Sequence, residues 1–449
     1  MTMLASSKGG SALKIAYYAD DFTGATDTLA TAARAGLRTL LFLGLPTTAQ
    51  LERAGPLDCL GIAGAARAMT PAEMQSELRP VGRLFAALEA PVIHYKTCST
   101  FDSAAHIGSI GAAIQILRPH AGNALVAVVG GQPNLRRYCV FGNLFAGAGK
   151  DGAISRLDRH PTMRQHPVTP MHEADLRLHL AQQGLKHVSS IAYPDYEQGD
   201  DALDRQLAAL LAQGPDAVLF DVADAAHLAP VGRLIWQHAQ RRRLLTAGPS
   251  SVVQALTAHW QTMPARREAA VAPAKGPVLV LAGSLSPMTA LQVGAATSYR
   301  HVVLDAARLA KDRDYLMHMG GQIAARLGEG DHVLACTSGQ GSAANAGTPA
   351  DARALAQACG ELLACVLKTV PVQRLGIAGG DTSSHAVQAL DAWGLAYQAQ
   401  LAPGVALCHL HSDNYSLDGM EIMLKGGQMG ADTLFEELLR GTAQMSFGA

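Results

Sequence analysis

The 449-residue chain has few cysteines, few aromatic residues and almost no net charge, and each shortage excludes a class of protein. Its seven cysteines are scattered without a CxxC pair, so neither a disulfide framework nor a zinc site is expected. Aromatic residues make up only 5%, whereas glycine and alanine are abundant, which favours a helix-rich α/β enzyme over a β-sandwich or a disordered chain. With 36 basic and 37 acidic residues, the chain has no overall basic field to hold nucleic acid.

The sequence also lacks long apolar runs and the two best-known phosphate-binding motifs. No run approaches the length of a membrane span, and residues 1–12 read as a polar, disordered tail rather than a signal peptide. These features predict a cytoplasmic protein that keeps its thiols reduced. Neither GxxxxGK[ST] nor a good GxGxxG is found, so any nucleotide site must be of another kind.

Strand-like apolar runs alternate with helical patterns along both halves of the chain, which predicts βαβ units and mostly parallel sheets. Between residues 146 and 172, Gly, Pro, His and Arg are frequent, and we expect a long functional loop there. The candidate strands are 14–18, 39–43, 59–63, 92–96, 124–129, 188–191 and 217–221 in the first half, and 278–282, 301–304, 332–336, 374–378 and 405–409 in the second.

A change of composition near residue 264 predicts a linker between two domains. The stretch 263–276 is rich in Ala, Pro and Gly, and a fresh α/β series follows it. We therefore predict a tail over 1–12, a first domain over 13–262, the linker over 263–276 and a second domain over 277–449. Each domain is expected to be a mostly parallel sheet flanked by helices, with ligands at the carboxyl ends of the strands.

The most informative segment is DDFTG at 20–24, where two acids follow the first strand. Adjacent carboxylates repel, so they need a cation, a polar substrate or a proton to relieve them. Helix capping is an equally good interpretation, with Thr23 or Asp20 at the N-cap and Gly24 in the turn, before a helix over 26–35. Capping and catalysis can also coexist.

Polar side chains end two further strands of the first half. Arg67 follows the strand 59–63, where its guanidinium could grip a carboxylate, although a surface salt bridge explains it equally well. Lys96 ends an apolar run and is followed by hydroxyl groups and an acid, a pattern that solvation alone explains less well.

Three small-residue loops lie at strand-to-helix junctions of the second half. Free backbone N–H groups and the helix dipole favour phosphate at such a junction, and glycine lets the phosphate come close to the backbone. One such loop is weak support for a nucleotide site, whereas three in one domain are stronger. The loops are 282–289, 378–384 and 425–430.

Taken together, these segments resemble the four-carbon acid sugar kinase family over nearly the whole chain, from about residue 14 to 439. The resemblance implies an amino-terminal domain that binds the acid sugar, a carboxyl-terminal domain that binds ATP, and an active site in the cleft between them. The segments that carry it are DDFTG (20–24), KTCSTFDS (96–103), HPVTPM (166–171), GSLS (283–286), GGDT (379–382) and KGGQMG (425–430).

Roles for individual residues follow from this resemblance. Asp21 is the first candidate for orienting or deprotonating the acceptor hydroxyl, and Asp20 is the second. Arg67, Lys96, Ser99 and Thr100 are expected to hold the carboxylate and hydroxyls of the sugar. Asp381 could also hold a Mg²⁺ ion shared with the phosphates. Nucleotide contacts are assigned to Ser284, Ser286, Gly379, Gly380, Asp381, Thr382, Gly427 and Gly430.

The family includes kinases of threonate, erythronate, 3-oxo-tetronate and 3-oxo-isoapionate. Many tetronate kinases have Lys-Ser-Gly-Asn-Phe-Gly where this chain has KGGQMG, and Glu is frequent where it has Asp381. The segment 37–43 and the Gly-Gly-Gln loop favour the 3-oxo-isoapionate branch without fixing the substrate. A dinucleotide-dependent oxidoreductase and a two-domain solute-binding protein are the alternatives, and the sequence leaves a homodimer open.

Overall fold

One long sheet runs through the whole molecule in the computed structural model, which describes residues 13–147, 152–166, 168–260, 270–283, 286–337 and 349–442. The sheet has 15 strands. In order across the sheet they are β13 (Arg300–Val303), β14 (Val333–Cys336), β12 (Val278–Ala282), β15 (Arg374–Ala378), β18 (Glu421–Lys425), β17 (Val405–His411), β16 (Gly394–Ala402), β2 (Thr39–Phe42), β3 (Cys59–Ala63), β1 (Ile15–Ala19), β4 (Val92–Lys96), β11 (Leu244–Gly248), β5 (Val126–Gly130), β10 (Ala217–Asp221) and β9 (Val188–Ile191).

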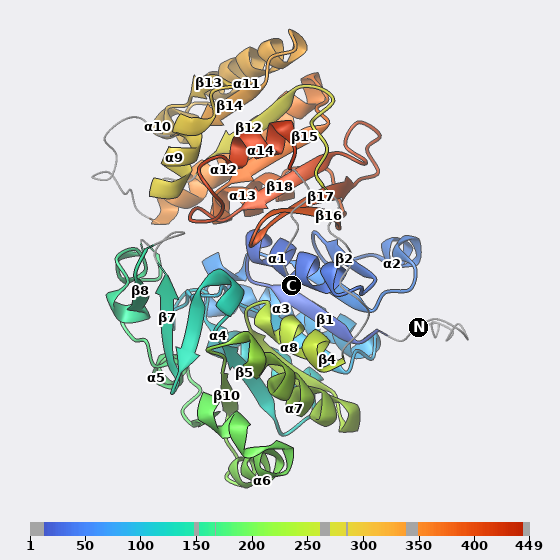
Figure 1. The fold of residues 1–449 in the computed structure, drawn as a ribbon. Coiled ribbons are helices and arrows are strands. Elements are labelled where there is room, and N and C mark those ends of the chain that lie inside the picture. Colours follow the sequence, from blue (N-terminus) through green and yellow to red (C-terminus); the bar gives the residue numbers. More distant parts are fainter. Residues whose placement is uncertain are drawn as a thin grey trace.

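Helices cover both faces of this sheet (Figure 1). They are α1 (Phe22–Arg34), α2 (Thr48–Ala54), α3 (Pro71–Ala87), α4 (Ile110–Leu117), α5 (Leu176–Ala181), α6 (Asp200–Leu211), α7 (Leu228–Arg241), α8 (Ser251–Trp260), α9 (Pro287–Ala295), α10 (Ala306–Lys311), α11 (Arg313–Gly328), α12 (Pro349–Thr369), α13 (Gly380–Gln388) and α14 (Leu434–Arg440).

The α/β fold with mostly parallel sheets is confirmed, and the two halves are joined through their sheets. In the order across the sheet, the eight strands β2, β3, β1, β4, β11, β5, β10 and β9 are parallel to their neighbours. The five strands β13, β14, β12, β15 and β18 form a second parallel set. The antiparallel strands β17 and β16 connect the two sets, and β16 pairs with β2 at only two positions, Gly394 with Phe42 and Leu395 with Leu41. Figure 1 shows α1 and β2 at this boundary, beneath β16.

The core is two-sided, as expected for parallel strands that are buried on both faces. Along β1, Ile15, Tyr17 and Ala19 belong to one hydrophobic cluster, and Ala16 and Tyr18 to another on the opposite face. The first cluster continues through α1 into the second half of the chain. Apolar packing therefore supports the short β2–β16 junction.

The segment expected to be a long loop over 146–172 contains regular structure. A three-stranded antiparallel sheet joins β6 (Arg137–Val140), β7 (Asn143–Gly147) and β8 (Ile154–Arg156), and 3₁₀ turns follow it. Glycine and proline around these short strands hid their pattern. The predicted tail and the linker residues 263–269 lie outside the described residues.

Candidate active site

Asp20 and Asp21 lie where β1 ends and α1 begins, in the middle of the first parallel set. The helix starts at Phe22, earlier than the sequence pattern indicated, and its N-cap is Asp21 rather than Thr23 or Asp20. The Asp21 carboxylate accepts a hydrogen bond from the Gly24 backbone N–H at 2.9 Å and one from the Thr23 hydroxyl at 2.6 Å. Capping therefore fixes the orientation of one of the two acids.

The two neighbouring carboxyl groups have opposite electrostatic surroundings. Arg67 in the 3₁₀ turn Ala66–Ala68 places Nη1 3.1 Å from Asp21 Oδ2. Burial alone would raise the Asp21 pKa, but the charges of Arg67 and Lys96 and the capping bonds hold it below its usual value. Asp20 is 1% exposed, and neither of its carboxylate oxygens has a hydrogen-bond partner within the described residues. Burial and the negative charge of Asp21 raise its pKa to about 7.

Lys96 ends β4, and its ammonium lies beside this pair of acids. Its Nζ donates to the Thr97 carbonyl at 2.7 Å. Gly24 makes this packing possible, because a Cβ there would lie 2.3 Å from Lys96 Nζ and 2.4 Å from Asp21 Oδ1. Ser99 and Thr100 follow in the next turn, half-buried and buried respectively. The structure thus gathers the predicted sugar-side residues at one edge of the sheet.

Three further polar side chains at this edge were given no role in the sequence analysis. Asp102 and Gln132 are buried, and each has one side-chain oxygen without a hydrogen-bond partner in the described part of the chain. Arg137, at the start of β6, has an Nε with no hydrogen-bond partner among the residues that the structure describes. Asp102 lies in the segment 96–103, which carries part of the family resemblance. Gln132 and Arg137 lie on either side of the turn before β6, a strand that was not predicted.

On the nucleotide side, the glycine loops follow β12, β15 and β18. Gly379 has φ of 123°, and Gly380 begins α13. A Cβ at Gly283 would lie 2.3 Å from Thr382 Oγ1, so the first two loops touch where only glycine fits. Gly430 has φ of 83°. Ser284 lies outside the described residues, as does the side chain of Asp381.

The third loop is held by hydrogen bonds to one carbonyl oxygen. Gly427 O accepts from the Ser286 hydroxyl at 2.5 Å, the Thr289 hydroxyl at 3.0 Å and Lys425 Nζ at 3.2 Å. Ser286 also caps α9 by accepting from the Thr289 N–H. Lys425 is fully buried, and burial lowers its pKa to about 7. Such a desolvated lysine beside three glycine loops is suited to an anionic ligand.

The two sets of residues meet at Gly380. A Cβ built there would lie 2.6 Å from Arg67 Nη2 and 3.7 Å from Asp21 Oδ2. Likewise, a Cβ on Gly426 would lie 4.0 Å from the Thr23 hydroxyl. The acid pair of the first half therefore faces the start of α13 in the second half. This arrangement places a potential acceptor site beside a potential phosphate site.

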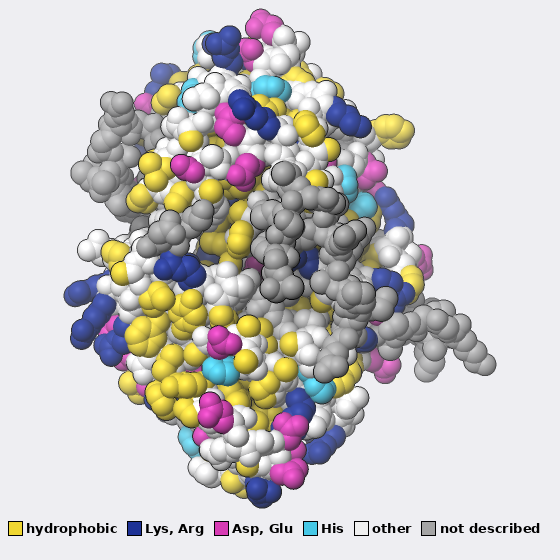
Figure 2. Space-filling model, in the orientation of Figure 1, with side chains coloured by type: hydrophobic (Ala, Val, Ile, Leu, Met, Phe, Trp, Pro, Cys, Tyr) yellow, Lys and Arg dark blue, Asp and Glu magenta, His cyan; other side chains and the backbone are white. Residues whose placement is uncertain are grey.

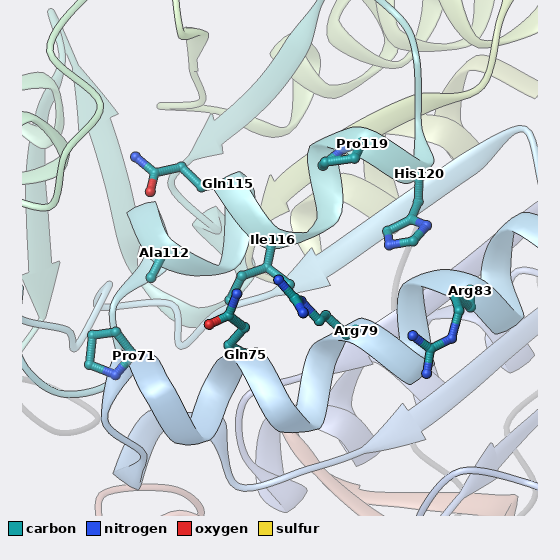
Figure 3. Close-up of a pocket in the computed structure, with 9 residues that line it drawn as sticks. All are labelled: Pro71, Gln75, Arg79, Arg83, Ala112, Gln115, Ile116, Pro119 and His120. Carbon is teal, nitrogen blue, oxygen red and sulfur yellow. The ribbon is translucent and has the colours of Figure 1, made fainter.

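A surface pocket of about 600 Å³ lies elsewhere, between α3 and α4. Figure 3 shows Arg79, Arg83 and His120 along it, with Gln75 and Gln115. None of the predicted site residues lines this pocket. Figure 2 shows acidic and basic side chains mixed over the face in view, in keeping with the net charge of −1.

Comparison with known protein families assigns the two halves. Residues 15–256 match a sugar-binding N-terminal domain, and residues 279–435 match a nucleotide-binding C-terminal domain. The chain belongs to the four-carbon acid sugar kinase family. This confirms the prediction of an acid sugar kinase at the level of the family. It disfavours the two alternatives, a dinucleotide-dependent oxidoreductase and a solute-binding protein.

Individual relatives agree with this family. The chain is 39% identical to a 3-oxo-isoapionate kinase of Paraburkholderia graminis, over 96% of this chain and 94% of the relative. It is 31% identical to a 3-oxo-tetronate kinase of Methylobacterium radiotolerans, over 95% of this chain and 99% of the relative. A crystal structure of a Haemophilus influenzae protein superposes with a TM-score of 0.69 at 27% identity, over 94% of this chain and 98% of that one.

A Salmonella typhimurium LT2 protein shares the fold, with a TM-score of 0.77 at 24% identity over 95% of this chain and 99% of that one. No helix in the described part of this kinase is both long and apolar enough to cross a membrane.

The close approach at Gly380 leads to a testable expectation. Gly380→Ala should push the Arg67 guanidinium away from Asp21, because the new methyl group would overlap Nη2. A displacement of about 1 Å in an active site can cost roughly a hundredfold in turnover, so we expect kcat to fall about tenfold to a hundredfold. Steady-state kinetics and thermal melting would measure the effect.

Gly321→Ala is the matched control, because a Cβ at that exposed position of α11 meets nothing within 4 Å. It should leave kcat unchanged and slightly stabilise the helix. Equal kcat for Gly380→Ala and the wild type would contradict a role for this contact in catalysis.

Proposed function

We propose that this protein is an ATP-dependent kinase that phosphorylates a hydroxyl of a branched 3-oxo sugar acid of the 3-oxo-isoapionate type. The 39% identity to a 3-oxo-isoapionate kinase favours this substrate over 3-oxo-tetronate, threonate or erythronate. One observation carries the proposal: the Arg67–Asp21 ion pair of the sugar-binding half lies against Gly380 at the start of α13. The acceptor hydroxyl and the γ-phosphate would meet there.

The acceptor hydroxyl needs a base, and we favour Asp20 over Asp21. The Asp21 carboxylate is occupied by Arg67, Thr23 and Gly24, and its pKa is depressed, which makes it a poor proton acceptor. Asp20 has no such partners among the described residues, and its pKa of about 7 is matched to general base catalysis near neutral pH. Asp21 would then hold Arg67 in place beside the transferred phosphoryl group.

The remaining candidates surround this point from both halves. Lys96, Ser99 and Thr100 are proposed to contact the sugar acid, and Arg67 to contact the reacting groups. The nucleotide would lie against the loops after β12, β15 and β18, where α9 and α13 begin. Its proposed contacts are Ser284, Ser286, Gly379, Gly380, Thr382, Gly427 and Gly430.

A magnesium ion is proposed to neutralise the phosphates. Among the described side chains, no group of three or more His, Cys, Asp or Glu residues could hold a metal ion by itself. Mg²⁺ typically uses one or two carboxylates together with the substrate phosphates. Asp381 remains the candidate ligand from the sequence. Phosphoryl transfer then depends mainly on positioning and charge neutralisation by the residues already named.

A substrate panel tests the proposal directly. The purified protein would be incubated with ATP–Mg²⁺ and 3-oxo-isoapionate, 3-oxo-tetronate, D-threonate, D-erythronate or erythritol, and ADP release would be followed. We expect the highest kcat/KM with 3-oxo-isoapionate and very little activity with erythritol, which has no carboxylate. A preference for 3-oxo-tetronate would overturn the substrate assignment, and no ADP release with any acid would overturn the kinase assignment.

A further inference from the structure

We propose that Arg137 binds the carboxylate of the acid sugar and thereby selects acids over neutral polyols. This inference rests on the proposed kinase function, and it identifies the residue that recognises the charged end of the substrate. Arg137 was not among the residues predicted from the sequence.

The other two cations on the sugar side of the site, Arg67 and Lys96, are already engaged by protein groups. Arg67 pairs with Asp21 at 3.1 Å and reaches toward Gly380, where it is better placed for the phosphoryl group than for the far end of the sugar. Lys96 Nζ donates to the Thr97 carbonyl at 2.7 Å, beside the Asp21 carboxylate. A carboxylate-binding cation must therefore be sought further along the same edge.

Arg137 has the unmet hydrogen-bonding capacity that such a role requires. Its Nη1 donates to the Leu135 carbonyl, which fixes one side of the guanidinium. Its Nε is buried and has no hydrogen-bond acceptor, and no carboxylate in the described residues forms an ion pair with it. A buried N–H group of a guanidinium that lacks an acceptor is costly, and a substrate carboxylate could satisfy it through two parallel hydrogen bonds to the guanidinium.

The fold places Arg137 beside the other sugar-side residues. The Arg137 and Gln132 backbones hydrogen-bond to each other in both directions at the end of β5. Burial lowers the Arg137 pKa, and the nearby Cys98 and Asp102 partly offset this effect. Asp102 in turn helps to raise the pKa of Asp20. Asp102, in the segment that follows β4, therefore interacts electrostatically with both Arg137 and the proposed base, Asp20.

Buried oxygen atoms near Arg137 that lack hydrogen-bond donors in the described residues suit the hydroxyl groups of a polyhydroxy acid. Asp102 Oδ1, Gln132 Oε1 and both oxygens of Asp20 are buried acceptors without a donor in the described residues. The Gln132 amide is oriented by its Nε2, which donates to Asp27 Oδ2 at 3.1 Å, so its oxygen is left as the free acceptor. Sugar hydroxyls can donate to these oxygens while the sugar carboxylate accepts from Arg137.

The test compares Arg137→Gln with Arg136→Gln, a neighbouring control. Arg136 carries the same charge, but its guanidinium donates to the Gly152 carbonyl. We expect Arg137→Gln to raise KM for 3-oxo-isoapionate about tenfold to a hundredfold, as for loss of a charged hydrogen bond. The Kd for ATP and the residual rate on erythritol should stay within twofold, and Arg136→Gln should resemble the wild type in all three.

Direct binding separates this inference from the kinase proposal. Titration calorimetry without ATP would measure D-erythronate binding to the wild type, Arg137→Gln and Arg137→Lys, with thermal melting to check folding. Arg137→Lys keeps the charge but not the planar fork, so its affinity should be intermediate. Equal losses on acid and polyol, or an unchanged KM in a folded Arg137→Gln protein, would refute the role of Arg137 alone. A wild type that neither binds nor phosphorylates any acid would refute the kinase proposal and this inference together.

Discussion

Replacing Asp20 by Asn should lower kcat about 10²–10⁴-fold, the usual contribution of general acid–base catalysis. The substitution preserves the size of the side chain but removes its ability to accept the hydroxyl proton. The Kd for ATP should barely change, because Asp20 lies in the sugar-binding half. Single-turnover kinetics and nucleotide titration would measure the two effects separately.

The pH dependence provides an independent check on this assignment. Since the Asp20 pKa is raised to about 7, wild-type kcat/KM should fall as the pH drops below 7 and the base becomes protonated. Asp21→Asn is the control: the acid limb should persist in it but move to lower pH, because the negative charge that helps to raise the Asp20 pKa has been removed. If kcat/KM of Asp20→Asn still falls below pH 7 as in the wild type, another group is the base.

Above pH 7, the Asp20→Asn substitution should stabilise the folded protein although it lowers the catalytic rate. The Asp20 pKa is about 7 in the folded protein and near 3.8 in the unfolded protein. The contribution of Asp20 to the stability of the fold is therefore fully present only below pH 3.8, and it is lost as the pH rises to about 7. Above pH 7 the ionised Asp20 therefore destabilises the wild type, by up to roughly 4 kcal/mol. Asp20→Asn should melt at a higher temperature than the wild type at pH 8. A lower melting temperature would indicate a structural role instead.

The sequence predicts the site where local patterns determine it. Strand-to-helix junctions are visible as apolar runs that end in acids, hydroxyls or glycines, and parallel strands bring such junctions to one edge. Asp20 and Lys96 could therefore be predicted to lie at the same edge of the sheet, and the structure adds that β1 and β4 pair directly. Most strands of the long sheet were predicted where four or five apolar residues stand between clear turns, whereas β11 (Leu244–Gly248) and β18 (Glu421–Lys425) were missed.

Contacts between distant segments could not be predicted in this way. The β2–β16 pairing depends on two residues from each strand, and β16 itself was not expected. Arg137 follows a left-handed residue, Arg136 with φ of 60°, in a hairpin that its glycine-rich surroundings disguised. Its proposed role also depends on Asp102, which follows β4 and is distant from Arg137 in the sequence. Only the three-dimensional structure shows which cations are already paired.

Lys425→Met should weaken ATP binding about tenfold to a hundredfold, as expected when a charged hydrogen-bond donor is removed. Lys425 is fully buried at the end of β18, where it donates to the Thr289 hydroxyl at 2.9 Å and to Gly427 O. Met has a similar length and suits the apolar surroundings, so the fold should survive. Titration calorimetry would compare this variant with Lys311→Met, which removes an exposed lysine at the end of α10.

Proton uptake on binding would distinguish a phosphate-binding lysine from a purely structural one. Because burial lowers the Lys425 pKa to about 7, the side chain is mostly neutral at pH 8. An approaching polyphosphate favours the charged form and should raise this pKa, so ATP binding at pH 8 should take up close to one proton. Calorimetry in buffers of different ionisation enthalpy measures this number. The uptake should disappear in Lys425→Met and persist in Lys311→Met. Equal uptake in both variants would mean that Lys425 stabilises the Gly427 loop without binding phosphate.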